Sequence, residues 1–443
     1  MIEWNLFHSS DTPLHIQLQT LSFPEEISQS LPSSAHVSSY NFGDSDIKKE
    51  FISQCLFCHQ FGNTTTRIPR PVDAWNTIID RMEGMGAIIT FKTDDSLGSI
   101  LHNEINGKPV LKQHAFTLAP QVLQSTIREW SLAEPTSYIH DIEIGQDQKI
   151  YGVDMGTDSI YVLDPKTNTI EKYSYPPNNY PLGGMFSGAF HPLGTFAAYH
   201  APHSLQTGPD GKMWSTNSLA AELSSFDPKT KIFKTFDIKN GAVYPHTLRL
   251  DKEGKIWFTI ALTNQIGMFD PKTEKFTIVK LPSHGFFRWL TESLVPVIIK
   301  VAAWFPQKNY HISLSLHKIT GLGHKIFNLP YGIDISPIDG SVWYSKLYSG
   351  YIGRLDPKTL QVEEIETPLA GPRRLRFSQD GTLWIPSYEE SGLMKFNPTS
   401  KKFTPYKIPT LAPDEFETPY ALNIHPQTQE VWITAGLSDR ILR

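Results

Sequence analysis

Residues 208–230, Gly-Pro-Asp-Gly-Lys-Met-Trp-Ser-Thr-Asn-Ser-Leu-Ala-Ala-Glu-Leu-Ser-Ser-Phe-Asp-Pro-Lys-Thr, decide the fold of most of this chain. They contain a turn, a short strand around Trp214, a second short strand, and an Asp-Pro-Lys-Thr turn. The same tetrapeptide begins at Asp164, Asp270 and Asp356, with a worn copy at Asn397. The copies fit a unit of about 42 residues with four short strands, which is the size and content of a propeller blade.

Six such units can be counted from their aromatic strands, at Tyr151, Trp214, Trp257, Trp343, Trp384 and Trp432. The last unit stops before its outer strand, and residues 127–132 have the pattern of that missing strand. We therefore expect both ends of the propeller to share one closing blade, which would remove an exposed sheet edge. The prediction is an all-β propeller over 124–443 with six blades. Seven blades are the alternative if an apolar helical insertion at about 283–325 hides a degenerate copy.

The chain places both of its cysteines in one short motif, Cys55-Leu56-Phe57-Cys58-His59. Cys-x-x-Cys-His is typical of a c-type haem attachment site, in which both thiols bind the porphyrin and the histidine binds the iron. The alternatives are a thioredoxin-like redox pair and half of a zinc site. The first lacks a surrounding βαβ pattern, and the second needs two more ligands at matching spacing.

Helical periodicity surrounds this motif. Apolar residues fall on one helical face over 47–55, again over 75–82, and a third time over 94–106. Three short helices around one covalent haem c predict a small all-α cytochrome c-like domain over 43–115. Residues 1–42 are rich in Ser and Pro, and we interpret them as an N-terminal segment that remains from an upstream region.

Haem iron in an electron-transfer protein needs a second axial ligand, and a methionine thioether raises the reduction potential. Met82 is the first candidate because it lies on the apolar face of the second predicted helix. Met85 is the alternative, and His102 and His114 are lesser ones.

The stretch from Cys55 to Met82 resembles the cytochrome domains of quinohaemoprotein amine dehydrogenases and of bacterial proteins fused to lyase-like propellers. The blade repeat, with Pro-His before it and Asp-Pro-Lys-Thr after it, resembles the streptogramin (virginiamycin) B lyase family. That family implies a propeller that opens a cyclic depsipeptide by magnesium-assisted elimination, with histidine and glutamate from the inner strands.

The acidic position of that family is poorly kept in this chain. Its equivalents in the six units are Asp154, Asn217, Ile260, Lys346, Ser387 and Ala435. Only Asp154 is acidic, and magnesium prefers carboxylate ligands. Magnesium is therefore expected only if the lyase alternative holds.

A second position, aligned on Pro-x-x-Leu, carries the candidate ligands of the propeller channel. Its residues are His140, His203, His246, Tyr331, Arg373 and Tyr420. Equivalent inner-strand positions form a ring, so the histidines would hold a metal, supply a general base, or form a stacked collar around the channel. His203 and His246 are the catalytic candidates.

Composition limits the class of protein and its partners. The 443 residues are 40% hydrophobic and 12% aromatic with a net charge of −5, which indicates a globular protein and argues against nucleic acid as a partner. No apolar run is long enough for an ordinary transmembrane helix. Residues 286–305, however, carry only Arg288, Glu292 and Lys300 as charges. This helix either contacts a membrane interface peripherally or packs across the propeller face against the haem domain.

The favoured function is an electron-transfer protein or oxidoreductase component whose propeller binds a redox partner protein or a small-molecule substrate. A streptogramin B lyase-like carbon-oxygen lyase with an appended haem domain is the runner-up, and an interaction scaffold is the third hypothesis. Covalent haem implies export to the periplasm or beyond. The opening residues lack the features of a signal peptide, so we expect a signal upstream of Met1.

Overall fold

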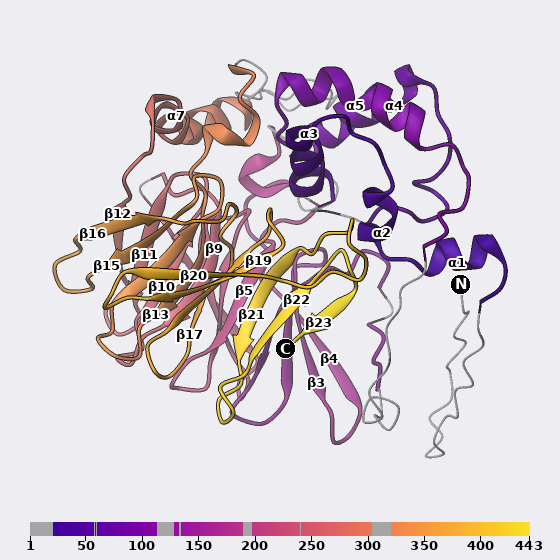
Figure 1. Cartoon of the computed structure of the whole chain (residues 1–443). Coiled ribbons are helices and arrows are strands. Elements are labelled where there is room, and N and C mark those ends of the chain that lie inside the picture. Colours follow the sequence, from indigo (N-terminus) through magenta and orange to yellow (C-terminus); the bar gives the residue numbers. More distant parts are fainter. Residues whose placement is uncertain are drawn as a thin grey trace.

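The computed structural model describes residues 21–56, 58, 60–112, 128–132, 134–188, 197–239, 241–303 and 320–443. A small helical region lies over one end of a ring of β-sheets (Figure 1). The sheets number six, so the predicted order of an all-α region followed by a six-bladed propeller is confirmed.

Five of the sheets have four antiparallel strands in sequence order, with the first strand innermost. They are β1 to β4 (Ile139–Ile144, Ile150–Asp154, Ser159–Asp164, Thr169–Ser174) and β5 to β8 (Pro202–Thr207, Met213–Asn217, Glu222–Asp227, Ile232–Asp237). The third is β9 to β12 (Pro245–Leu250, Ile256–Ile260, Gln265–Asp270, Lys275–Lys280). The fourth and fifth are β13 to β16 (Pro330–Ile335, Val342–Lys346, Tyr351–Leu355, Val362–Glu366) and β17 to β20 (Arg376–Phe377, Leu383–Ser387, Gly392–Asn397, Lys402–Lys407).

The repeated Asp-Pro turn connects the third and fourth strand of each of these sheets. In the second sheet the Asp227 carboxylate accepts a hydrogen bond from the Lys229 amide at 2.8 Å, and Lys231 then takes a left-handed φ of 62°. Asn397, in the worn copy, accepts from the Thr399 amide at 3.0 Å, so the amide side chain replaces the carboxylate. Side chains that cap their own backbone in this way stabilise tight turns, which is why the tetrapeptide marks the repeat.

The last sheet has only three strands, β21 to β23 (Pro419–Ile424, Val431–Ala435, Arg440–Leu442). The predicted closing strand is wrong for the described residues 128–132, which form no strand. Trp130 instead donates to the Asn168 side chain at 3.3 Å, in the turn between β3 and β4.

The helical region contacts the last sheet of the propeller: Gln60 donates to Asp439 at 2.7 Å, and the Ser34 amide donates to the Leu437 carbonyl at 2.8 Å.

The insertion holds helices rather than a seventh blade. Its described residues form α7 (Phe286–Ala303) and the short η4 (Gly323–Ile326), and the described part of the chain contains no seventh sheet. A second short helix, η2 (Gly184–Phe186), lies in the connection between the first two sheets. Val295 and Ile299 of α7 pack in one core with Phe186 and Ile326.

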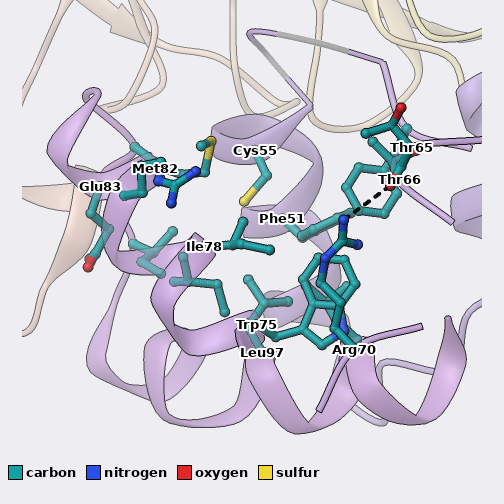
Figure 2. Close-up of a pocket in the computed structure, with 16 residues that line it drawn as sticks. Phe51, Cys55, Thr65, Thr66, Arg70, Trp75, Ile78, Met82, Glu83 and Leu97 are labelled. Atoms are coloured by element: carbon teal, nitrogen blue, oxygen red, sulfur yellow. Dashed lines mark hydrogen bonds between the residues drawn. The ribbon is translucent and has the colours of Figure 1, made fainter. Parts of the chain in front are cut away.

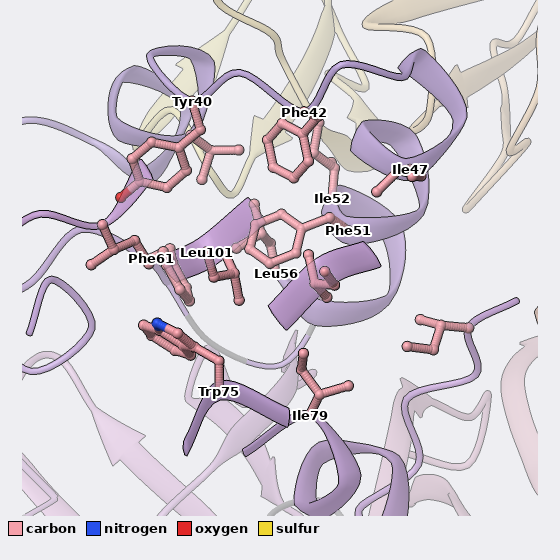
Figure 3. Close-up of a cluster of buried hydrophobic side chains, with 14 of the residues drawn as sticks. Tyr40, Phe42, Ile47, Phe51, Ile52, Leu56, Phe61, Trp75, Ile79 and Leu101 are labelled. Atoms are coloured by element: carbon pink, nitrogen blue, oxygen red, sulfur yellow. The ribbon is translucent and has the colours of Figure 1, made fainter. Parts of the chain in front are cut away.

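The helical region consists of α1 (Pro24–Ser30), α2 (Ser33–Ser38), α3 (Ser45–Glu50), the π-helix η1 (Phe51–Cys55), α4 (Val72–Gly84) and α5 (Phe91–Glu104). Its core joins side chains from the segment between α2 and α5, among them Tyr40, Phe51, Trp75 and Leu101 (Figure 3). The helical region therefore begins before residue 43, the predicted start. Helices as short as α1 and α2 leave too little periodicity to be recognised in a sequence.

Polar side chains join the helical region to the propeller. Gln54 donates to the Tyr348 hydroxyl at 3.1 Å, and His324 of η4 lies 3.2 Å from the Glu50 carboxylate. The described helices include none with the length and apolarity that crossing a bilayer requires.

Candidate functional site

The cysteine motif begins at the end of a helix whose last turn is widened. Asp44 caps α3 by accepting from the Asp46 and Ile47 amides, and α3 continues into η1, where the Leu56 amide bonds to the Phe51 carbonyl. Such π-helical turns are rare and are frequent at functional sites. His59, the predicted proximal ligand, lies outside the described residues.

Both thiols are free: Cys55 is half-buried and Cys58 is exposed. The surroundings of Cys55 raise the pKa of its thiol to about 12 through burial, with a contribution from neighbouring Cys58. A thioredoxin-like cysteine has a lowered pKa, because the thiolate is the nucleophile. The thiol environment therefore does not suit the redox-pair alternative.

Cys55 and Met82 line the same cavity inside the helical region. It has a volume of about 230 Å³ and is bounded mainly by apolar side chains from η1, α4 and α5. Figure 2 shows the Cys55 side chain pointing into the space ringed by Phe51, Ile78 and Met82. The structure thus brings together the first cysteine of the motif and the preferred candidate for the second iron ligand.

Cationic side chains lie at the edge of this cavity. Arg70 and Arg81 both line it, and the Arg70 guanidinium lies 5.0 Å from the centre of the Trp75 ring. Arg70 also donates to the Ile68 carbonyl at 2.9 Å. These contacts hold Arg70 over the aromatic wall of the cavity.

Cys58 and Met85 line a different cavity, which lies between the helical region and the propeller channel. This channel cavity has a volume of about 150 Å³ and is also lined by Gln54 of the helical region. On the propeller side it is lined by His140, His203, His246, Tyr331 and Arg373, all from the aligned channel position. The motif therefore lies between two cavities of different chemistry.

The aligned channel residues form a collar of closely packed rings, each tilted relative to the next. Successive ring centres are 3.6 Å apart from His140 to His203, 4.0 Å from His203 to His246, and 4.0 Å from His246 to Tyr331. The collar continues through Tyr420, whose hydroxyl lies 2.7 Å from that of Tyr331. Arg373 completes it, with its guanidinium 4.3 Å from the centre of the Tyr420 ring.

Irregular strand pairing places these residues in the channel. The register between the first and second strand shifts beside His140, His203, His246, Tyr331 and Tyr420. A bulge leaves one residue of the strand unpaired and redirects its side chain. The same local irregularity in successive blades thus gathers the collar around one axis.

The collar histidines are neutral at pH 7. Burial, together with the positive charge of Arg374, lowers the pKa of His140 to about 4 and the pKa of His246 well below its usual value. Burial likewise lowers the pKa of His203. The Nδ1 of His140 donates to the His203 carbonyl at 2.8 Å, so Nε2 is the unprotonated nitrogen of that neutral ring. Such weakly basic rings suit hydrogen bonding better than general-base catalysis, which needs a pKa near the operating pH.

Two guanidinium groups give the channel a positive charge. Arg373 is 2% exposed, and its guanidinium lies 3.8 Å from the centre of the Tyr388 ring. Arg374 of the same blade reaches Asp141 of the first blade at 3.4 Å. The channel is therefore suited to a ligand with aromatic character or negative charge.

Asp154, predicted as a channel ligand, is not among the residues that line this cavity. Its buried carboxylate accepts from the Tyr138, Gly156 and Thr157 amides at 2.8, 2.8 and 3.1 Å, and thereby fixes the turn after β2. Sequence alignment placed it at the position of the family's acid, but these local backbone donors occupy the carboxylate.

At the equivalent position of the fourth blade, Lys346 is fully buried and lies 2.6 Å from the Glu364 carboxylate. The described residues contain no cluster of His, Cys, Asp and Glu side chains arranged to hold a metal ion.

Several lining residues were missed from the sequence. Tyr138, Tyr244 and Leu329 occupy one position, two residues before the collar, and all three line the channel cavity. Tyr244 and Leu329 have φ values of 66° and 56°, in a region that glycine favours. The repeat places these three residues at the same distance before the collar residue in each blade. Their residue types, however, did not indicate a turn that directs them inward.

Comparison with known proteins supports the propeller. The chain is similar in structure to virginiamycin B lyase from Staphylococcus aureus, with 17% identity and a TM-score of 0.51, over 72% of this chain and 84% of that one. A second solved streptogramin B lyase gives 16% identity and a TM-score of 0.52, over 72% and 82%. No protein-family model matches the chain, and no curated protein matches it by sequence. At these identities the likeness shows the fold alone: a six-bladed propeller similar to that of virginiamycin B lyase.

Proposed function

We propose that this chain is a redox protein whose helical region carries one haem c beside a substrate-binding or partner-binding propeller channel. Cys55 and Cys58 would hold the porphyrin, with His59 and Met82 as the axial iron ligands. The observation that carries the proposal is that Cys55 and Met82 line one apolar cavity in the helical region. When bound, haem would supply a one-electron centre.

Of the residues assigned to this group, Cys55 and Met82 line the helical cavity, whereas Cys58 lines the channel cavity. Phe51, Trp75 and Leu97 give the helical cavity aromatic and aliphatic walls suited to a porphyrin, and Arg70 and Arg81 offer positive charge at its edge for the propionates. A thioether is also the ligand type that favours ferrous iron. Cys58 lines the neighbouring channel cavity, and it is close enough to Cys55 to contribute to the raised pKa of that thiol.

The channel cavity supports a binding role for the propeller. Its neutral histidines, its tyrosines and Arg373 combine aromatic surface with hydrogen-bonding groups. Because Cys58 forms part of its wall, a small molecule bound there would lie next to the haem attachment segment. Covalent haem attachment also requires export, so we place the protein in the periplasm or outside the cell.

A magnesium-dependent lyase of the streptogramin type is the second candidate, because His203 and His246 do line the channel cavity. Such an elimination needs a base and a cation to stabilise developing negative charge. The lowered pKa values of the histidines and the backbone contacts of Asp154 leave both requirements poorly met. We therefore rank this activity below the redox function.

The proposed function can be tested by following haem reduction in the purified full-length holoprotein. Hydroquinone serves as a small aromatic probe. Each hydroquinone loses two electrons and two protons, and the electrons reduce the ferric haems of two protein molecules to the ferrous state. We expect His203→Ala with His246→Ala to slow this reduction by about tenfold, the effect of roughly 1.4 kcal/mol of lost binding. Reduction by dithionite is the control and should be unchanged. Equal hydroquinone rates in the parent and the variant would contradict a channel role.

A further inference from the structure

Helix α7 buries Val295 and Ile299 in a core with Phe186, but it also exposes large apolar side chains on its outer face. An ordinary surface helix carries mainly polar side chains on that face. Six of its large apolar side chains are exposed: Phe286 (65%), Phe287 (50%), Trp289 (54%), Leu294 (37%), Val297 (56%) and Val301 (38%). Its only acidic residue, Glu292, is buried. The outward face therefore has no negative charge.

Inward contacts fix α7 in this orientation. Arg288 donates to the Lys325 and His284 carbonyls at 3.0 and 2.8 Å. Glu292 accepts from the Asn328 side chain at 2.5 Å and from the Ser283 hydroxyl at 2.5 Å. Rotating the helix to hide its exposed apolar face would break these hydrogen bonds, of which the one from Asn328 to Glu292 is buried and costly to leave unmade.

The first turn of α7 carries an exposed aromatic cluster. The ring centres of Phe286 and Phe287 are 5.7 Å apart, and those of Phe286 and Trp289 are 5.9 Å apart. Lys300 is exposed on the same helix, and Lys325 is exposed beside Arg288. Aromatic side chains favour the level of the lipid head groups, and lysines attract anionic lipids.

We propose that the outward face of α7 binds the surface of an anionic lipid bilayer, with the helix lying in the membrane interface. All six exposed apolar side chains come from one helix, which makes a ridge about 27 Å long. A lipid surface can accept such a narrow ridge, whereas a stable protein interface usually covers about 800 Å² on each partner.

Figure 1 shows α7 and the helical region at the same end of the propeller. Membrane binding through α7 would therefore bring the helical region close to the bilayer. If the proposed haem is present, it would then be positioned to exchange electrons with a carrier in the membrane. This last step rests on the proposed function, whereas the membrane contact itself does not.

Vesicle co-sedimentation of the full-length protein tests the inference. We expect the parent to bind vesicles of phosphatidylcholine with phosphatidylglycerol, and to bind vesicles of phosphatidylcholine alone more weakly. Phe286→Ser with Trp289→Ser should weaken binding to both by about tenfold or more, because two large apolar groups are lost. Lys300→Glu should weaken binding only to the anionic vesicles.

The matched control is Ile338→Ser, which removes a 70% exposed apolar side chain from the turn between β13 and β14. This variant should bind like the parent. Absence of parent binding to either vesicle, or unchanged binding of the double variant, would overturn the inference. A concentration-dependent dimer that the double substitution abolishes would also overturn it, by showing that the face binds protein. Thermal unfolding of each variant verifies that it is folded, so a loss of binding can be assigned to the surface.

Discussion

The cavity inside the helical region is bounded mainly by apolar side chains and contains a thiol and a thioether, Cys55 and Met82. The channel cavity beside it is lined by closely packed histidines, tyrosines and the buried guanidinium of Arg373. Both adjoin the same short cysteine motif. The helical cavity suits a large apolar group and offers a thioether as a soft ligand for iron. The channel cavity suits a small aromatic or anionic molecule.

This difference suggests that the two neighbouring cavities have different roles. The apolar cavity would hold the electron-carrying group, and the polar channel would select the molecule that exchanges electrons with it. A motif at the boundary connects the two, because Cys55 faces the first cavity and Cys58 the second. Changes in one cavity should therefore affect properties that changes in the other leave unaltered.

The largest expected effect concerns the iron ligand. Met82→Ala should lower the haem reduction potential by an amount on the order of hundreds of millivolts, or open the iron to added ligands, because axial ligand identity is a main determinant of potential. Met85→Ala is the matched control, since Met85 lines the channel cavity instead. Potentiometric titration measures both. A shift in potential caused by Met85→Ala and not by Met82→Ala would place the iron ligand in the channel cavity, and the proposed roles of the two cavities would then be wrong.

The channel collar should make the protein sensitive to acid. The pKa of His140 is about 4 in the folded protein, whereas its ordinary value, which applies to the unfolded chain, is 6.5. Between these pH values the unfolded chain therefore binds more protons than the folded one. Stability from this group is thus present above pH 6.5 and is lost as the pH falls toward 4, by up to about 3 kcal/mol. Urea unfolding measured across this pH range checks it. His140→Gln should flatten the profile, and an unaltered slope would show that the collar does not titrate in this way.

A smaller effect is expected from the buried channel cation. Arg373→Met keeps much of the side-chain volume but loses the contacts with the Tyr388 and Tyr420 rings at 3.8 and 4.3 Å, so unfolding should need about 1 to 2 kcal/mol less free energy. Arg354→Met is the control: its ion pair with Asp339 is solvent-exposed and should contribute less than about 1 kcal/mol. Denaturant titration compares the two. Equal effects would mean that the aromatic contacts of Arg373 add nothing to stability.

Repetition explains why the propeller was predicted more completely than the helical region. Each Asp-Pro turn marks the same hairpin, and alignment of the copies also located the collar positions from His140 to Tyr420. The repeat did not predict the last blade correctly, because residues 128–132 match the outer-strand pattern but form no strand. Whether a segment pairs with a sheet edge depends on its tertiary context, which a strand pattern alone does not encode.

The helical region occurs once, so its sequence offered only local signals. Periodicity located α4 and α5 from residues such as Trp75 and Leu97. The short helices before residue 43, the π-turn at η1 and the fact that Cys55 and Cys58 face different cavities had no such signal. These features became visible only in the three-dimensional structure.

The central claim is that this motif carries a covalent haem, and peptide mass spectrometry tests it most directly. The full-length protein would be produced with a cytochrome c maturation system, denatured, extracted with acid acetone and digested. We predict that the peptide containing Cys55 and Cys58 gains the mass of one haem, and that Cys55→Ser with Cys58→Ser abolishes the gain. A peptide of unmodified mass from the parent, with both thiols free, would contradict the account.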